Sequence, residues 1–197
     1  EKNALTILTQ PRLNFADLKA LQDALRGIVE EVTPGAIKII NDVALKNELI
    51  DKLAYDATFN PNQDVVSETR KLIKGIAASL GIKSASVYDL YVEKARDPRN
   101  YTYPAINIRF MAYDTARAVF ESALKNRVGA TVGVPIFEIA KSEIGYTGQR
   151  PAEYTTSVLA AAIKEGWRQA VHLQGDHFQI AAKDYLANPE KARDAIK

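Results

Sequence analysis

The residues best suited to chemistry are Asp176 and His177, which follow an apolar segment that runs from Ala170 to Leu173. This segment predicts a short buried strand, and Gly175 predicts its end. In α/β proteins, catalytic and ligand-binding residues lie at the carboxyl ends of the strands, where this acid and imidazole are expected. The carboxylate can transfer a proton, and a neutral imidazole can bind a metal ion. A solvated acid beside a structural histidine would give the same dipeptide, so the surrounding pattern must decide.

After residue 100 the chain alternates between short apolar segments and amphipathic ones. The expected strands cover residues 105–108, 134–140 and 170–174, and the expected helices cover residues 113–126, 151–166 and 181 onwards, with a break at Asn188 and Pro189. This alternation predicts a parallel sheet with right-handed crossovers. The short strands and compact units favour the first three βα units of a (β/α)8 barrel within residues 101–197. A complete barrel takes roughly 250 residues, so we expect the chain to be an incomplete record of a longer protein.

Residues 1–100 predict a helical N-terminal region. A lead-in with strand character is expected at residues 1–10, and Asn14 is the predicted cap of a first helix that reaches Val29. Further helices are expected at residues 37–55 and 65–80, the latter ended by Gly81, and a fourth after Ser84. Such a region could cover one end of the following domain or form a subunit interface.

Bulk composition narrows the class of protein. Of the 197 residues, 47% are hydrophobic and 25% charged, which predicts a globular core. The net charge of +2 gives no reason to expect nucleic-acid binding, and no apolar run approaches the roughly 20 residues that span a bilayer. Cysteine is absent, which excludes disulfides and thiolate metal sites and fits a cytoplasmic protein. The two histidines, His172 and His177, cannot form a histidine-rich metal site by themselves.

Three motifs occur in a recognisable order. They are AINI at residues 105–108, YTG at residues 146–148 followed by PAEY at residues 151–154, and GDH at residues 175–177. In this order and spacing they resemble the class II, metal-dependent ketose-bisphosphate aldolases, which include the fructose- and tagatose-bisphosphate aldolases. The YTG and GDH motifs also resemble the companion subunit of tagatose-bisphosphate aldolase, which is regarded as non-catalytic. The resemblance covers residues 103–180.

The resemblance implies a role for several residues. Asp176 matches the acid that handles the proton of a substrate hydroxyl during carbon–carbon cleavage, and His177 matches a ligand of the divalent metal, which we expect to be zinc. Asn107 matches an asparagine that lines the substrate pocket. The family places a phosphate-binding serine after the second strand; here Ala140 occupies that position, and Ser142 is the nearest candidate. A phosphorylated ketose is the implied substrate, a homo-oligomer is expected, and further metal ligands would lie on later strands.

Other interpretations stay open. Lys141 could form a Schiff base in a metal-independent aldolase, although a solvated loop lysine is the simpler interpretation. Glu138 interrupts an apolar strand, so it should face a barrel interior or pair with a cation.

Arg150 could hold a phosphate, and His172 is expected to be a structural histidine below Asp176. The alternative function is a non-catalytic barrel subunit that supports a partner aldolase, and a barrel enzyme of another chemistry is a third.

Overall fold

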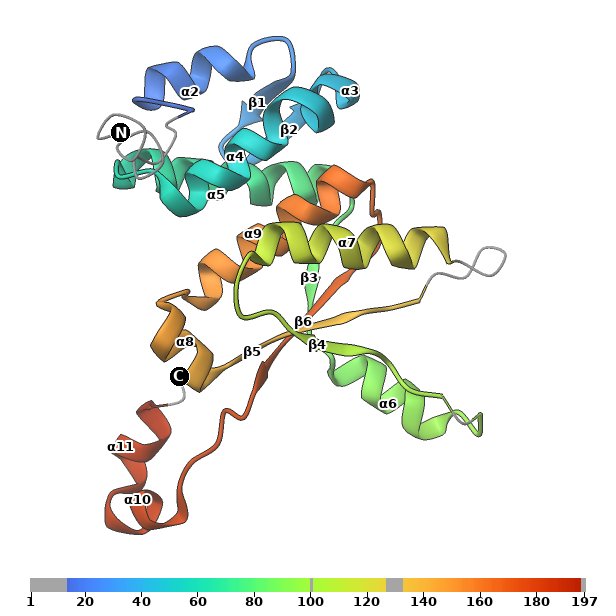
Figure 1. Ribbon diagram of the computed structural model, residues 1–197, viewed down its shortest axis with the longest axis vertical. Coiled ribbons are helices and arrows are strands. Elements are labelled where there is room, and N and C mark those ends of the chain that lie inside the picture. The colour runs from blue at the N-terminus through green and yellow to red at the C-terminus, as the bar shows by residue number, and fades with distance from the viewer. Residues whose placement is uncertain (1–13, 100, 127–132, 196–197) are drawn as a thin grey trace, which may run out of the picture.

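The computed structural model describes residues 14–99, 101–126 and 133–195, and shows an α/β protein with a four-stranded parallel sheet (Figure 1). The predicted lead-in at residues 1–10 lies outside the described residues. Helices α2 (Leu18–Leu25), α4 (Ile50–Phe59) and α5 (Gln63–Ser79) form one end of the molecule. Helices α7 (Ala112–Lys125) and α9 (Pro151–Glu165) lie between them and the sheet, and α10 (Ala182–Ala187) and α11 (Pro189–Asp194) lie at the opposite end.

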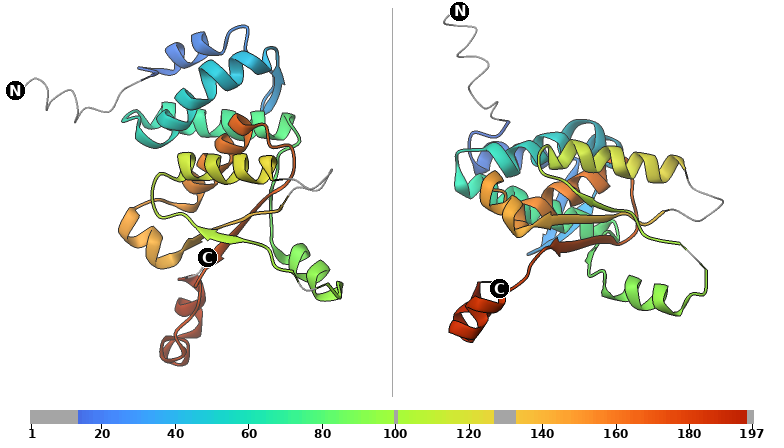
Figure 2. Two further views of the ribbon diagram at one scale, coloured as in Figure 1. Left: turned by 45° about the vertical axis from the view of Figure 1, so that its right-hand side comes forward. Right: turned by 60° about the horizontal axis from the view of Figure 1, so that its bottom comes forward.

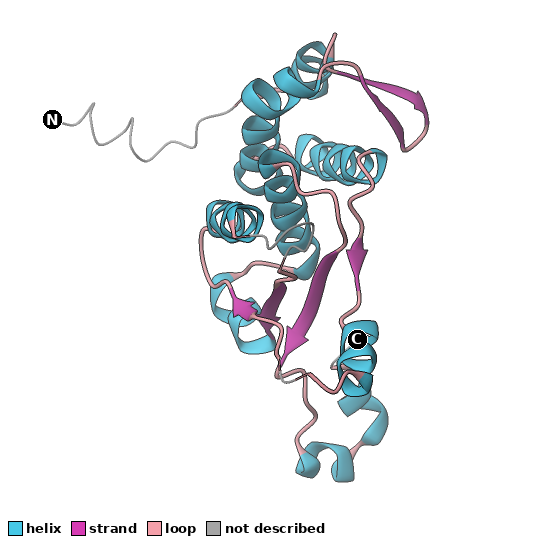
Figure 3. Ribbon diagram, turned by 90° about the vertical axis from the view of Figure 1, so that its right-hand side faces the viewer, coloured by secondary structure: helices cyan, strands magenta, loops and turns pink. Residues whose placement is uncertain are grey.

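The first part of the chain contains a β-hairpin that the sequence did not predict. Helix α2 (Leu18–Leu25) is capped by Asp17, whose carboxylate accepts the Ala20 N–H at 2.7 Å, so the predicted cap at Asn14 is wrong. Strands β1 (Val29–Thr33) and β2 (Ala36–Ile39) then pair antiparallel where a helix was expected. Pro34 followed by Gly35 with φ of 81° suits a type II turn, and this turn reverses the chain. The hairpin projects from the end of the molecule that contains α2 (Figure 3).

Helices then follow almost without a break. They are α3 (Asp42–Ala44), the π-helical segment η1 (Leu45–Leu49), α4 (Ile50–Phe59) and α5 (Gln63–Ser79). The expected stop after α5 is confirmed, because Gly81 adopts a left-handed φ of 75° there. Ser84 does not cap the next helix; it belongs to β3 (Ser84–Ala85), and α6 (Tyr88–Arg96) follows.

The sheet contains β4 (Ala105–Asn107), β5 (Ile136–Ala140), β6 (Val171–Asp176) and β3, in the order β3-β6-β5-β4 with every pair parallel. Helix α7 (Ala112–Lys125) follows β4, and α8 (Lys141–Thr147) and α9 (Pro151–Glu165) follow β5. Helices α10 (Ala182–Ala187) and α11 (Pro189–Asp194) follow β6 and project away from the sheet (Figure 2). The three predicted strand–helix units are therefore present, and α8 is an addition. β3 pairs with β6 instead of β4, so its place departs from the sequential strand order of a barrel.

A continuous hydrophobic core joins the two parts of the chain. Every residue from Val158 to Ile163 is buried, because α9 packs between the sheet, α7 and the helices α4 and α5 (Figure 1). The rings of Phe137 on β5 and Trp167 after α9 each lie 5.0 Å from the ring of Phe120 on α7. One core and the β3–β6 pairing extend across residue 100. The domain boundary predicted there stays a prediction.

The two faces of the sheet differ in chemistry. Alternation along β5 directs Phe137 and Ile139 toward the helices and Glu138 toward the opposite face. The register places Asn107, Glu138 and Gln174 side by side on that opposite face. From α6, the Tyr91 hydroxyl donates a hydrogen bond to Gln174 Oε1 at 3.0 Å. Among the described residues, no helix is long and apolar enough to cross a membrane.

Candidate functional site

The carboxyl ends of β4 and β6 bring two of the predicted site residues together. Asn107 ends β4 and Asp176 ends β6, and the side-chain amide of Asn107 donates a hydrogen bond to Asp176 Oδ2 at 3.0 Å. These residues are 69 positions apart in the chain. They meet because parallel strands that start at one edge of a sheet also end at one edge. We call the group Asn107, Glu143, Asp176 and His177 the carboxyl-edge site.

His177 adopts a conformation that is uncommon outside glycine. Its φ of 52° lies in the left-handed region, its side chain is 75% exposed, and its Nε2 lies 3.5 Å from Asp176 Oδ1. Histidine is one of the residues enriched in that region, and such outliers cluster at functional sites. Gly175 makes room for the turn, since a Cβ there would lie 2.5 Å from the ring of Phe178.

Glu143 completes the site, and the sequence did not assign it a role. Its side chain is only 4% exposed, and its carboxylate accepts hydrogen bonds from the Ala140 N–H at 2.9 Å and from Arg109 Nε at 2.8 Å. Asn107 Nδ2 lies 3.4 Å from the same carboxylate. Glu143 is the third residue of α8, and a glutamate there that bonds back to the residue before the helix is half of a capping box. A glutamate at the third position of a helix could have predicted this hydrogen bond from sequence, but helix α8 itself was not predicted.

Burial and hydrogen bonding act in opposite directions on Glu143. Burial alone would raise the pKa of its carboxyl, but the donors from Ala140, Arg109 and Asn107 outweigh burial and hold the pKa below its usual value. Arg109 is 65% exposed, and its hydrogen bond to Glu143 raises the pKa of its guanidinium. The carboxyl-edge site therefore contains a buried, ionised carboxylate besides Asp176.

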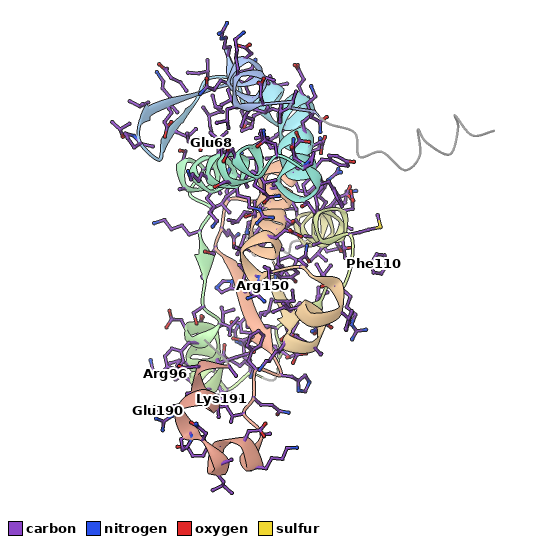
Figure 4. The ribbon with its side chains drawn as sticks, turned by 90° about the vertical axis from the view of Figure 1, so that its left-hand side faces the viewer. Glu68, Arg96, Phe110, Arg150, Glu190 and Lys191 are labelled. Carbon is purple, nitrogen blue, oxygen red and sulfur yellow. The ribbon has the colours of Figure 1, made fainter. Side chains whose placement is uncertain are left out.

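Two further candidates lie near the site without joining its hydrogen bonds. Ser142 and Lys141 are exposed in the first turn of α8. Lys141 lines a cavity of about 530 Å³, and Asp184 and Lys191 also line it. Arg150, the exposed residue before α9, lies beside that helix, while Lys191 lies farther along the molecule on α11 (Figure 4).

His172 and Glu138 lie deeper on the polar face. Glu138 is buried and accepts a hydrogen bond from the Gln174 side-chain amide, so its described partner is an amide and not a cation. His172 is half-buried, its Nδ1 has no hydrogen-bond partner among the described residues, and burial lowers the pKa of its imidazole. A neutral, partly buried ring suits the expected structural role.

The described residues do not form a complete metal site. They contain no group of three or more histidine, aspartate or glutamate side chains that could hold one ion. Zinc usually takes three or four protein ligands, whereas His177 and Asp176 offer two at most. The exposed imidazole of His177 fits a single ligand of a larger set.

Comparisons of the chain with models of protein families, with curated proteins and with solved structures found no match. What the carboxyl-edge site does is therefore inferred from its geometry and from the three sequence motifs.

Proposed function

We propose that this chain provides the proton-transferring part of a metal-dependent aldolase that cleaves phosphorylated ketoses such as fructose or tagatose bisphosphate. The observation that carries the proposal is the hydrogen bond between Asn107 and Asp176 at the carboxyl edge of the sheet, with His177 next in the chain. The order of the AINI, YTG and GDH motifs supports it. The protein is proposed to be cytoplasmic and homo-oligomeric.

The site offers one acid–base group in a fixed position. Asp176 Oδ2 accepts the hydrogen bond from the Asn107 amide, and Oδ1, which lies 3.5 Å from His177 Nε2, is the oxygen proposed to accept the proton of a substrate hydroxyl. As that proton leaves, the hydroxyl oxygen becomes a carbonyl, the neighbouring carbon–carbon bond breaks, and its electron pair passes to the other fragment as an enediolate. A divalent metal, when bound, would stabilise the enediolate charge as a Lewis acid. Within this chain His177 is the proposed ligand, and Ser142 the proposed contact to a phosphate.

A (β/α)8 barrel is the proposed setting for this chemistry. Strands β4, β5 and β6 neighbour one another in chain order, as the first three strands of a barrel would. Helices cover one face of these strands, and the opposite face carries the polar row Asn107, Glu138 and Gln174, which suits a barrel interior. The ligands that the described residues lack would come from other barrel strands.

The test is the metal content of the purified protein together with cleavage of fructose 1,6-bisphosphate and tagatose 1,6-bisphosphate. The proposal predicts bound zinc, cleavage of at least one sugar, and loss of cleavage after chelation that added zinc restores. Cleavage that survives chelation and is trapped by borohydride at Lys141 would replace the metal mechanism with a Schiff base.

One observation favours the alternative of a supporting subunit. The YTG and GDH motifs also resemble the companion subunit of tagatose-bisphosphate aldolase, which is regarded as non-catalytic. A supporting subunit would bind no zinc and cleave neither sugar alone, yet would raise the activity or stability of a partner aldolase in a mixture. Zinc-dependent cleavage by this protein alone would exclude that alternative.

A further inference from the structure

Both amide protons of Asn107 face carboxylates. Its Nδ2 lies 3.0 Å from Asp176 Oδ2 on one side and 3.4 Å from Glu143 Oε2 on the other. An amide nitrogen donates two hydrogen bonds and a carbonyl oxygen only accepts them. Rotating this amide by 180° would place its oxygen against two negative groups. The paired carboxylates therefore fix which end of Asn107 points into the protein.

Glu143 is held in place independently of Asn107. The Ala140 N–H and Arg109 Nε bind its carboxylate at 2.9 and 2.8 Å, and the side chain is 4% exposed. A buried carboxylate with two other donors cannot easily turn away from the asparagine. Glu143 is thus the fixed partner and Asn107 the group that it orients.

The remaining polar atom of Asn107 is available to a ligand. Its Oδ1 accepts no hydrogen bond from the described residues, and it is not one of their fully buried unpaired polar atoms, so it is at least partly exposed on a half-buried residue. A fixed carbonyl oxygen beside Asp176 accepts a hydrogen bond but cannot give one.

We propose that Glu143 is a positioning residue that holds the side-chain carbonyl of Asn107 toward the ligand. The ligand group that faces Asn107 Oδ1 must then be a hydrogen-bond donor, so the carboxyl-edge site selects a hydroxyl there over a carbonyl or carboxylate. This deepens the proposed function and rests on it for the identity of the ligand, but the locked amide itself is a property of the free protein. The two parts can therefore be tested separately.

The first test is made without ligand on protein labelled with ¹⁵N-asparagine. The Asn107 side-chain signal is assigned by its loss in Asn107→Ser, and the exchange of its amide protons with water is measured by saturation transfer. In Glu143→Gln, exchange should be about tenfold faster, because a charge-assisted hydrogen bond is lost and the new amide nitrogen faces another donor. Glu143→Asp should act in the same direction, because the shorter side chain withdraws the carboxylate.

The matched control is Glu138→Gln, which removes a different buried carboxylate, on the strand next to Asn107. Glu138 binds Gln174 and makes no hydrogen bond to Asn107, so the Asn107 signal should keep its wild-type exchange rate. Trp167 fluorescence checks that each variant is folded. Wild-type exchange in both Glu143 variants, or equal acceleration in Glu138→Gln, would overturn the proposal.

The second test asks whether Glu143 acts through Asn107 during cleavage of fructose 1,6-bisphosphate. Glu143→Gln should lower kcat about tenfold or more, and should cost little further activity in an Asn107→Ala background, because coupled residues are not additive. Additive losses would overturn the proposal. Absence of cleavage by the wild type would instead reject the proposed aldolase function. The orientation of the Asn107 amide would then be tested by the proton-exchange measurement alone.

Discussion

At the scale of single residues, the carboxyl-edge site depends on side chains that are far apart in sequence. The types of Asp176 and His177 could be recognised from the sequence, and Asn107 from its motif. Glu143, on α8, could not be assigned a role, because its partners Asn107, at the end of β4, and Arg109, two residues later, lie in a distant segment of the chain. Hydrogen bonds across a sheet depend on register, which short strands do not reveal from sequence alone.

Glu143 should make the stability of the protein depend on pH. Its folded pKa lies below the usual value, so its contribution to stability is complete above the unfolded pKa of about 4.3 and is lost as the pH falls through the folded pKa. Urea unfolding of wild type and Glu143→Gln should therefore differ most near pH 7, and the difference should shrink below about pH 4. A constant difference from pH 7 to pH 3 would contradict the assigned ionisation.

His177 should matter to metal binding and little to stability. Its side chain is 75% exposed and its described polar contact is with Asp176, so His177→Ala should lower the free energy of unfolding by no more than about 1 kcal/mol, mainly because alanine tolerates the left-handed φ of 52° less well than histidine. Under the proposed function the variant should lose bound zinc and cleavage, while His172→Gln should retain zinc. A His177→Ala protein with the full metal content would remove this residue from the site.

At the scale of elements, an aromatic contact region joins β5, α7 and the segment that follows α9. Phe120, Phe137 and Trp167 are all fully buried. The ring centroid of Phe120 lies 5.0 Å from that of Phe137 and 5.0 Å from that of Trp167. Apolar spacing predicted α7, β5 and α9 because their burial follows their sequence pattern. It failed at residues 29–39, where apolar residues compatible with a helix form the β1–β2 hairpin around Pro34 and Gly35. It also failed at Ser84, since a two-residue strand leaves no periodic signal.

Truncation of Phe137 should test the packing of β5 against α7. Phe137→Ala should lower the free energy of unfolding by about 3–5 kcal/mol, through lost burial and the cavity left behind. Phe110 is a matched control: it is 74% exposed and projects outward (Figure 4), so Phe110→Ala should be nearly neutral. Urea denaturation measures both, and similar losses in the two variants would contradict the described core.

At the scale of the whole molecule, the helices before residue 100 and the sheet after it share one interior. Polar contacts join the same surfaces: Arg70 pairs with Glu153 at 2.8 Å, and Lys164 pairs with Asp51 at 2.7 Å. The helical character of the first part and the βα order of the second could be predicted from local pattern. Their packing around α9, and the pairing of β3 with β6, could not, because both depend on contacts between distant segments.

The shared interior predicts a single cooperative unfolding transition. Trp167, the only tryptophan, lies in the core beside the sheet, whereas far-UV circular dichroism reports mainly on the helices, many of which lie before residue 100. Both signals should change with the same midpoint in urea. Two separate midpoints would show that the two parts of the chain unfold independently.

The carboxyl-edge site as a whole is tested most directly by zinc-dependent cleavage of fructose 1,6-bisphosphate and tagatose 1,6-bisphosphate, with wild type and Asp176→Asn compared after chelation and zinc addition. Asparagine keeps the shape of Asp176 but cannot accept the proton as a carboxylate does. We predict cleavage of at least one sugar by the zinc-loaded wild type, and a loss of about a hundredfold or more in Asp176→Asn. Equal cleavage by both proteins, or none by the zinc-loaded wild type, would contradict the proposed function.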